Sequence, residues 1–260
     1  MKIAVIGGAG VRTVIFINGL LKRYKNLNIH EVVLYDIQEE KQKIIEKLCK
    51  YVIDREQKDL RVGAVSDPVE AIRGAGFIVM TLRVWGDSSR VTDETVALDL
   101  GVMGQETTGA GGFFMAVRTI PVLLKYCEMI KRHAPKAWIF NFTNPSGLVT
   151  QALHNAGYSR IIGNNGSIPG LEYHDVIETT CLVSKDGICP VKIEEVPEDC
   201  YLLIRLIKMY EKLTVEAVKT QSRETAIKAL TLHPLVNSYS LAKQLVDRYD
   251  ETYGGMKNAI

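Results

Sequence analysis

Several features that define whole classes of protein are missing from this sequence. No apolar run reaches the roughly 18 residues that a membrane span needs, and the chain opens directly on a strand-like run at residues 2–6 without a signal peptide. The five cysteines form no Cys-x-x-Cys pair, which argues against a structural zinc site and for reduced thiols. We therefore expect a cytoplasmic protein that does not bind a membrane.

An excess of one charge is also missing. The chain has 32 Lys and Arg residues against 30 Asp and Glu residues, which gives a net charge of +2. The two signs are mixed along the sequence, and no basic stripe marks a nucleic-acid-binding surface. With 47% hydrophobic residues in 260 positions, the chain can bury the core of one large domain or two modest ones.

The first 163 residues alternate short β-rich runs with longer helical patterns. The β-rich runs are at 3–6, 31–35, 77–82, 138–142 and 160–162, and the helical patterns are at 11–24, 39–54, 89–100, 113–133 and 147–155. Buried strands separated by amphipathic helices predict right-handed βαβ units and a parallel sheet. We predict an α/β fold with a Rossmann-type domain of about six strands at residues 1–163.

The pattern changes after Gly163. Residues 164–170 are rich in turn formers, and two extended runs follow at 175–183 and 189–194, with Asp186-Gly187 between them as a hairpin signal. Helical patterns close the chain at 197–220, 222–232 and 240–249, the second with Ser222 as its expected N-cap. These features predict a smaller α+β region at residues 164–260.

A glycine-rich turn, Gly7-Gly8-Ala9-Gly10-Val11-Arg12-Thr13, joins the first strand to the first helix. In such turns one glycine avoids a clash and another lets a pyrophosphate approach the positive helix N-terminus. Asp36 ends the second strand, where an acid would hold a ribose 2′-hydroxyl and repel a 2′-phosphate. A plain glycine turn with a capping Asp is the alternative. The combined context favours NAD(H), bound by Gly8, Gly10, Val11, Arg12, Thr13 and Asp36.

Three longer motifs carry a family resemblance: Arg83-Val84-Trp85-Gly86, the run from Gly101-Val102-Met103-Gly104-Gln105-Glu106 to Gly112, and Asn141-Phe142-Thr143-Asn144-Pro145-Ser146-Gly147. With the glycine turn, they resemble glycoside hydrolase family four, the NAD- and metal-dependent α- and β-glycosidases. Many of these act on 6-phosphoglycosides, and their fold is similar to that of lactate and malate dehydrogenases. The resemblance covers nearly the whole chain.

The resemblance implies a reaction outside the usual two-carboxylate scheme. Bound NAD⁺ would take a hydride from the sugar C3, and the resulting ketone would acidify the C2 proton. A base would remove that proton, a manganese ion would stabilise the enediolate, and the glycosidic bond would leave by elimination. Water would then add, and NADH would return the hydride.

The resemblance also implies roles for four residues. Arg83 and Asn144 would contact the sugar or its phosphate, because a guanidinium offers a rigid fork of donors to an oxyanion. Glu106 would lie near the reactive centre and tune the base, and Asn141 joins the expected cofactor-binding residues. The alternatives are a surface ion pair for Arg83, a loop carboxylate for Glu106, and a turn with a cis bond at Asn144-Pro145.

The chain departs from the family after Gly163. There the family continues with a Cys that binds the metal, and later with a Gly-Leu-Asn-His ligand segment, a Tyr or Asp base and an Arg. This chain passes from Gly163 directly to Asn164-Asn165-Gly166, as though a large central segment were missing. His154, His174, Asp175 and Cys181 are candidate substitute ligands, but core or surface roles are favoured for them. No residue is therefore predicted to bind metal, although the family requires one.

Three functional hypotheses follow. The favoured one is an NAD(H)-binding relative of the glycosidases whose hydrolysis is crippled by the lost metal ligands and base. The second is an active 6-phospho-glycosidase or glucosidase that uses substitute residues, and the third is a simple NAD-dependent sugar dehydrogenase. All three imply a sugar or phospho-sugar as the small-molecule partner. Apolar surface left bare by the missing segment predicts a homo-oligomer.

Overall fold

The computed structural model describes residues 1–158, 164–184 and 187–256, and the chain divides into two compact units. Unit one comprises Met1–Arg83 and Lys125–Thr143, and unit two comprises Val84–Leu124 and Asn144–Ile260. The long helix α5 (Gly109–His133) contributes residues to both units. The domain boundary predicted from the sequence at residue 163 stays a prediction.

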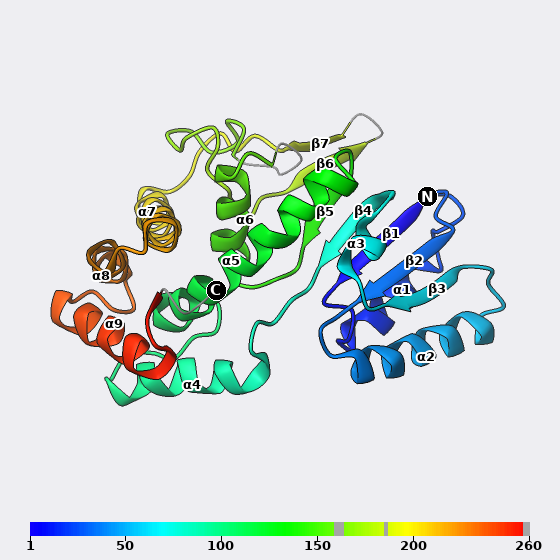
Figure 1. Cartoon of the computed structure of the whole chain (residues 1–260). Coiled ribbons are helices and arrows are strands. Elements are labelled where there is room, and N and C mark those ends of the chain that lie inside the picture. The colour runs from blue at the N-terminus through cyan, green and yellow to red at the C-terminus, as the bar shows by residue number, and fades with distance from the viewer. Residues whose placement is uncertain (159–163, 185–186, 257–260) are drawn as a thin grey trace. The chain divides into compact units, whose positions relative to one another are not determined.

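Unit one is built on a parallel five-stranded sheet in the order β3-β2-β1-β4-β5 (Figure 1). The strands are β1 (Lys2–Ile6), β2 (Glu31–Tyr35), β3 (Arg61–Val65), β4 (Ala75–Met80) and β5 (Trp138–Asn141). The central strands are almost fully buried apolar runs, as expected for a sheet covered on both faces. This sheet confirms the predicted α/β fold class.

Helices α1 (Arg12–Leu20) and α2 (Glu39–Arg55) pack on one face of this sheet. Their apolar stripes, including Ile17 and Ile45, share one core with Val5 and Leu34 from the strands. The apolar positions of α2 recur at intervals of three or four residues, so that one face of the helix is buried. This arrangement brings the start of α1 and the end of β2 to the same edge of the sheet.

Two elements of unit one were not predicted from the sequence. Strand β3 contains Gly63 at its centre and lies at the edge of the sheet, so its apolar alternation is weak. The short helix α3 (Pro68–Ile72) follows, with Asp67 as an N-cap that accepts a hydrogen bond from the Val69 N–H at 2.9 Å. The last of the five predicted β-rich runs, at 160–162, lies outside the described residues.

Unit two is mainly helical. Besides the first part of α5, it contains α4 (Gly86–Asp99), α6 (Ser146–Asn155), α7 (Glu198–Thr220), α8 (Arg223–Leu232) and α9 (Tyr239–Tyr253). Helix α7 packs against α6 and α8, and α9 packs against α8 and α4. Ser222 caps α8 as predicted, since its hydroxyl accepts a hydrogen bond from the Thr225 N–H at 3.1 Å.

The predicted hairpin of unit two is present but short. Strand β6 (Cys181–Ser184) pairs in antiparallel fashion with β7 (Gly187–Pro190), and the two residues of the turn lie outside the described residues. The extended runs expected at 175–183 and 189–194 were therefore too long. Residues 175–180 form no strand, because Asp175 and Val176 instead pack into unit two, where both are buried.

A buried ion pair links three helices of unit two. Arg118 of α5 is fully buried and donates two hydrogen bonds to Asp93 of α4, at 2.9 and 2.5 Å. The hydroxyl of Tyr253 in α9 donates to the same carboxylate at 2.7 Å. The guanidinium also lies 5.7 Å from the rings of both Trp85 and Tyr253. Its Nε donates to the Val84 carbonyl at 3.4 Å, so one cation anchors the first residues of unit two.

Removing one member of this pair is expected to be costly. Asp93→Ala would leave Arg118 charged and buried, which typically lowers the free energy of unfolding by about 3–5 kcal/mol. The neighbouring Glu94→Ala is the matched control, because its pair with Arg90 is partly exposed and is worth at most about 1 kcal/mol. Urea denaturation followed by circular dichroism measures both. Equal losses in the two variants would contradict the role given to the pair.

A second buried polar cluster, around His233, fixes the start of α5. The His233 Nε2 lies 2.7 Å from the Thr108 hydroxyl and accepts from the Gly109 N–H at 3.1 Å. Its Nδ1 lies 3.2 Å from the Leu235 N–H. The Tyr210 ring packs edge-on against the imidazole, and its hydroxyl donates to the Gly109 carbonyl at 2.8 Å. Burial lowers the pKa of His233 to about 4.

This lowered pKa predicts a loss of stability in mild acid. Between pH 6.5 and pH 4 the unfolded chain binds a proton at His233 that the folded chain rejects, so the free energy of unfolding falls as the pH falls. At pH 4 the loss from this residue is roughly 3 kcal/mol. The measurement is the unfolding free energy against pH for wild type, His233→Asn and the exposed-site control His30→Gln. A wild-type slope that persists in His233→Asn would refute the assignment.

Candidate functional site

Gly7 forms the sharp turn at the end of β1. Its φ is +89°, and a Cβ there would lie 2.5 Å from the Thr81 carbonyl oxygen. The N–H groups of Gly7 and Gly8 both donate to the Tyr35 carbonyl at 2.9 Å, which joins the turn to the end of β2. A Cβ on Gly8 would lie 3.0 Å from the Cβ of Leu34. The structure therefore adds Gly7 to the glycines predicted from the sequence.

Gly10 has a different environment, since a Cβ there would meet nothing within 4 Å. It precedes α1, whose first turn is capped by no side chain. Val11 and Arg12 are exposed beside it, and Thr13 is buried with its N–H donating to the Gly10 carbonyl at 3.0 Å. The positive end of a helix thus adjoins open space, which is the environment in which phosphate groups bind.

Asp36 lies beside this turn, at the end of β2. Its Oδ2 accepts from the Ala9 N–H at 3.0 Å, and its Oδ1 accepts from the Gln38 N–H at 2.9 Å. Gln42, which is buried on α2, donates to the carbonyls of Leu34 and Val65 and accepts from the Asp36 N–H at 3.2 Å. These bonds fix the carboxylate at the carboxyl edge of the sheet, where ligands of such folds bind.

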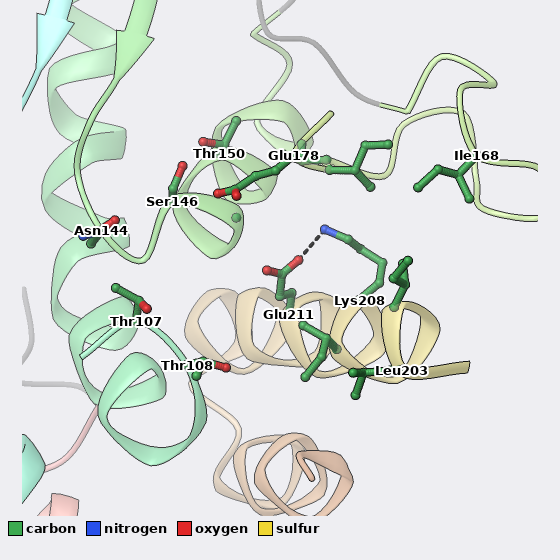
Figure 2. Close-up of a pocket in the computed structure, with 15 residues that line it drawn as sticks. Thr107, Thr108, Asn144, Ser146, Thr150, Ile168, Glu178, Leu203, Lys208 and Glu211 are labelled. Carbon is green, nitrogen blue, oxygen red and sulfur yellow. Dashed lines mark hydrogen bonds and ion pairs between the residues drawn. The ribbon is translucent and has the colours of Figure 1, made fainter. Parts of the chain in front are cut away.

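Unit two contains a cavity of about 610 Å³, which is within the usual range for small-molecule sites (Figure 2). Its polar lining residues carry hydroxyls, an amide and charged groups: Thr107, Thr108, Asn144, Ser146, Thr150, Glu178, Lys208 and Glu211. Its apolar lining residues are Ile168, Val176, Ile177, Leu203, Ile204 and Ile207, and Gly147 completes the lining. The residues come from α6, α7, the turn before α5 and the segment before β6.

The charged side chains of the cavity form a close group. Lys208 and Glu211 project from α7 toward the side that carries Ser146, Thr150 and Glu178 (Figure 2). The ammonium of Lys208 pairs with the carboxylate of Glu211, and these side chains are only 7% and 15% exposed. Burial raises the pKa of Glu211, Lys208 partly offsets this rise, and Glu178 and Asp175 add to it.

A glycine makes room for this pair. A Cβ on Gly147 would lie 2.2 Å from Oε1 of Glu211, so a side chain at residue 147 would make the Glu211 carboxylate move from its present position. The preceding Asn144-Pro145 peptide bond is cis, which is the alternative that the sequence left open. The third family motif therefore contributes both a lining amide and the space for Glu211.

The four site residues predicted from the resemblance do not all lie at the cavity of unit two. Asn144 lines the cavity, and Glu106 directly precedes the lining residue Thr107, with its Oε2 3.5 Å from Nη1 of Arg90. Arg83 is the last residue of the first segment of unit one. Asn141, also in unit one, exchanges two hydrogen bonds with the backbone of Thr143 at 3.1 and 3.0 Å. The ligand roles of these residues stay predictions.

Sequence reasoning missed the charged residues of the cavity. Lys208 and Glu211 are three residues apart on α7, and Glu178 lies before β6, in a part of the chain that carries no recognisable site motif. The only feature in the sequence that could have indicated them is a Lys and a Glu on the same face of a helix, with apolar residues between them. Such a pair is more often exposed to solvent than buried. Their burial depends on the packing of α7 against α6.

The described residues contain no group of three or more His, Cys, Asp or Glu side chains that could hold a metal ion. Of the four candidate substitute ligands, His154 and His174 lie together, with ring centroids 4.9 Å apart. Asp175 is instead paired with Lys212 at 2.6 Å. In the described part of the chain, no helix is both long and apolar enough to cross a bilayer.

Comparison with known sequences gives relatives that are longer than this chain. It is 39% identical over 166 residues to a 6-phospho-beta-glucosidase of Escherichia coli K12, which covers 63% of this chain and 37% of that enzyme. It is 39% identical over 165 residues to the 6-phospho-beta-glucosidase BglT of Thermotoga maritima, and 30% identical over 162 residues to 6-phospho-alpha-glucosidase 1 of Lacticaseibacillus paracasei. These matches cover 63% and 62% of this chain, and 39% and 37% of the two enzymes.

Solved structures share the fold. A 6-phospho-beta glucosidase from Thermotoga maritima, solved with manganese, NAD⁺ and glucose-6-phosphate, matches with a TM-score of 0.91 at 23% identity. A 6-phospho-alpha-glucosidase from gut microorganisms, solved with NAD and Mn²⁺, matches with a TM-score of 0.90 at 18% identity. Each match covers 98% of both chains.

Family models cover most of the sequence. The model of the family 4 glycosyl hydrolases matches residues 2–173, and the model of that family's C-terminal domain matches residues 149–236. The first match alone takes in well over half of the chain and contains the glycine turn, Asp36 and all three longer motifs. The chain therefore belongs to the family 4 glycosyl hydrolases.

Proposed function

We propose that this chain binds NAD(H) in unit one and a sugar or phospho-sugar as its second ligand, and that it hydrolyses glycosides poorly. The observation that carries the proposal is the turn from Gly7 to Gly10 beside Asp36. Relatives with this fold were solved with NAD and with glucose-6-phosphate, which supports the same two ligands here.

The residues of unit one fit NAD(H). The space at Gly10 and the uncapped start of α1 would receive the pyrophosphate, and Asp36 would accept a hydrogen bond from a ribose hydroxyl. Gly7 and Gln42 keep the turn and the carboxylate in place through their bonds to the ends of β2 and β3. When bound, the nicotinamide supplies a hydride acceptor for a carbinol C–H.

The described residues do not fit the manganese ion that is named with the relatives. A catalytic metal site needs about three protein ligands with supporting hydrogen bonds, and the pair of His154 and His174 is the nearest approach among the four substitutes considered. No step of the proposed function is therefore assigned to a metal in this chain. Loss of the family's metal ligands and base motivates the proposal that hydrolysis is weak.

The proposed internal deletion rests on the sequence, which passes from Gly163 directly to Asn164-Asn165-Gly166. The sequence matches cover 37–39% of the two 6-phospho-beta-glucosidases. The missing segment would include the metal-binding Cys and His, the base and the Arg that follow the position of Gly163 in the family.

Two other functions remain hypotheses. An active 6-phospho-glycosidase is favoured by the 39% identity to two enzymes with that activity in their names. A sugar dehydrogenase would need only hydride transfer and a proton acceptor. Self-association also stays a prediction, and it is supported by exposed apolar side chains on α7, at Leu202, Leu206 and Met209.

Replacing Gly10 should abolish cofactor binding. In Gly10→Val the side chain would fill the space proposed for the pyrophosphate, whereas the fold should persist because a Cβ there meets nothing. Gly63→Val is the matched control, since a Cβ at that position in β3 also meets nothing. Enhancement of NADH fluorescence measures binding. Undiminished enhancement in Gly10→Val would reject this cofactor site.

Hydrolysis by this chain should be slow or absent. Loss of a positioned base alone typically costs about 10²–10⁴ in rate, and loss of a stabilising metal costs several kcal/mol more. The assay is turnover of aryl glycosides and their 6-phosphates with NAD⁺, Mn²⁺ and a reductant. Sustained turnover that disappears in Glu106→Gln would show that other residues supply the missing chemistry.

A further inference from the structure

Gln42 interrupts the apolar pattern of α2. The buried residues of this helix recur at intervals of three or four and form one face: Gln42, Ile45, Cys49 and Ile53. The other three are apolar, so the pattern favours an apolar side chain at residue 42 as well. Gln42 is nevertheless only 2% exposed. A buried amide costs free energy unless its donors and its acceptor are paired, so its partners indicate what it does there.

The partners of the Gln42 side chain all lie at the carboxyl edge of the sheet. Its Nε2 donates to the carbonyls of Leu34 in β2 and Val65 in β3, at 2.7 and 2.9 Å. Its Oε1 accepts from the Asp36 N–H at 3.2 Å. A reversed amide would place its oxygen against two carbonyls, so these partners determine its orientation. Gln42 thus joins α2 to the ends of two strands and to the backbone of Asp36.

The position of the Asp36 carboxylate depends on that backbone. Its Oδ2 accepts from the Ala9 N–H at 3.0 Å, and its Oδ1 accepts from the Gln38 N–H at 2.9 Å. A carboxylate oxygen can accept two hydrogen bonds, so each oxygen can take one more from a ligand. The peptide of Asp36 lies one residue beyond β2, where Gln42 rather than a strand residue accepts its N–H. Without this bond the peptide could rotate and carry the carboxylate with it.

We propose that Gln42 is a positioning residue for cofactor selectivity, which acts by holding the backbone of Asp36. The held carboxylate can accept from the ribose 2′-hydroxyl of NAD(H) and repels the 2′-phosphate of NADP(H). A carboxylate free to turn toward solvent would do both less well, since the hydrogen bond needs a fixed geometry and the repulsion weakens with distance. The inference rests on the proposed function and deepens it, because it assigns part of the selectivity to a side chain buried behind the acid.

Titrations with NADH and NADPH test this role, because both cofactors are fluorescent. For wild type we expect NADH to bind at least about tenfold more tightly than NADPH. Gln42→Met removes the amide at similar volume, so it should weaken NADH more than NADPH and lower this preference by roughly fivefold. Gln42→Asn is a milder second variant, in which the amide is too short to reach Asp36. It should lower the preference in the same direction.

A double-mutant cycle separates positioning from a merely structural role. If Gln42 acts through Asp36, Gln42→Met should change the preference little in an Asp36→Ala background, whereas independent effects would add. Ile53→Ala is the matched control, because Ile53 is buried on the same face of α2 in the core of unit one. It should lower the midpoint of urea denaturation and leave the preference for NADH unchanged.

Several outcomes would overturn this role. They are an unchanged preference in both Gln42 variants, a fall of the same size in the Asp36→Ala background, or wild-type binding of NADPH as tight as that of NADH. With any of these results NADH still binds, so the proposed cofactor site stands. A wild-type chain that bound no NADH would instead refute the proposed function, and this inference with it.

Discussion

The Arg118–Asp93 pair is the interaction on which the organisation of unit two depends. A fully buried guanidinium requires a carboxylate and further acceptors, and it finds them on α4, at the Val84 carbonyl and among the rings that flank it. Three helices from distant parts of the sequence therefore meet in one arrangement. The start of α5, and with it the turn of Thr107 and Thr108, is held separately by the His233 cluster.

The polar lining of the cavity is supported in a similar way. His233 and Tyr210 hold the backbone at Gly109, so that Thr108 is positioned by residues more than a hundred positions later in the chain. A neutral imidazole suits this place better than an imidazolium, because backbone N–H groups face both ring nitrogens: the neutral ring can accept a hydrogen bond at one nitrogen, whereas an imidazolium can accept at neither. The buried polar groups of His233 and Tyr210 thus determine the position of the Thr108 side of the cavity.

Local signals in the sequence predicted the parts of the site that depend on local geometry. The glycine turn, the acid at the end of β2 and the Ser222 cap each require a residue type at a fixed offset from an element boundary, and the structure has each of them there. Lys208 and Glu211 could not be found in this way, because their importance arises from packing against α6, about sixty residues earlier. Strand β3 was missed because Gly63 interrupts its apolar pattern.

Gly147 couples two stretches of sequence that carry no common motif. Its missing side chain leaves the volume that the end of the Glu211 side chain occupies, so a larger residue at 147 would displace that carboxylate from its place beside Lys208. A shorter residue at 211 would leave Lys208 buried without its partner. Among homologous chains we therefore expect the identities at these two positions to be correlated.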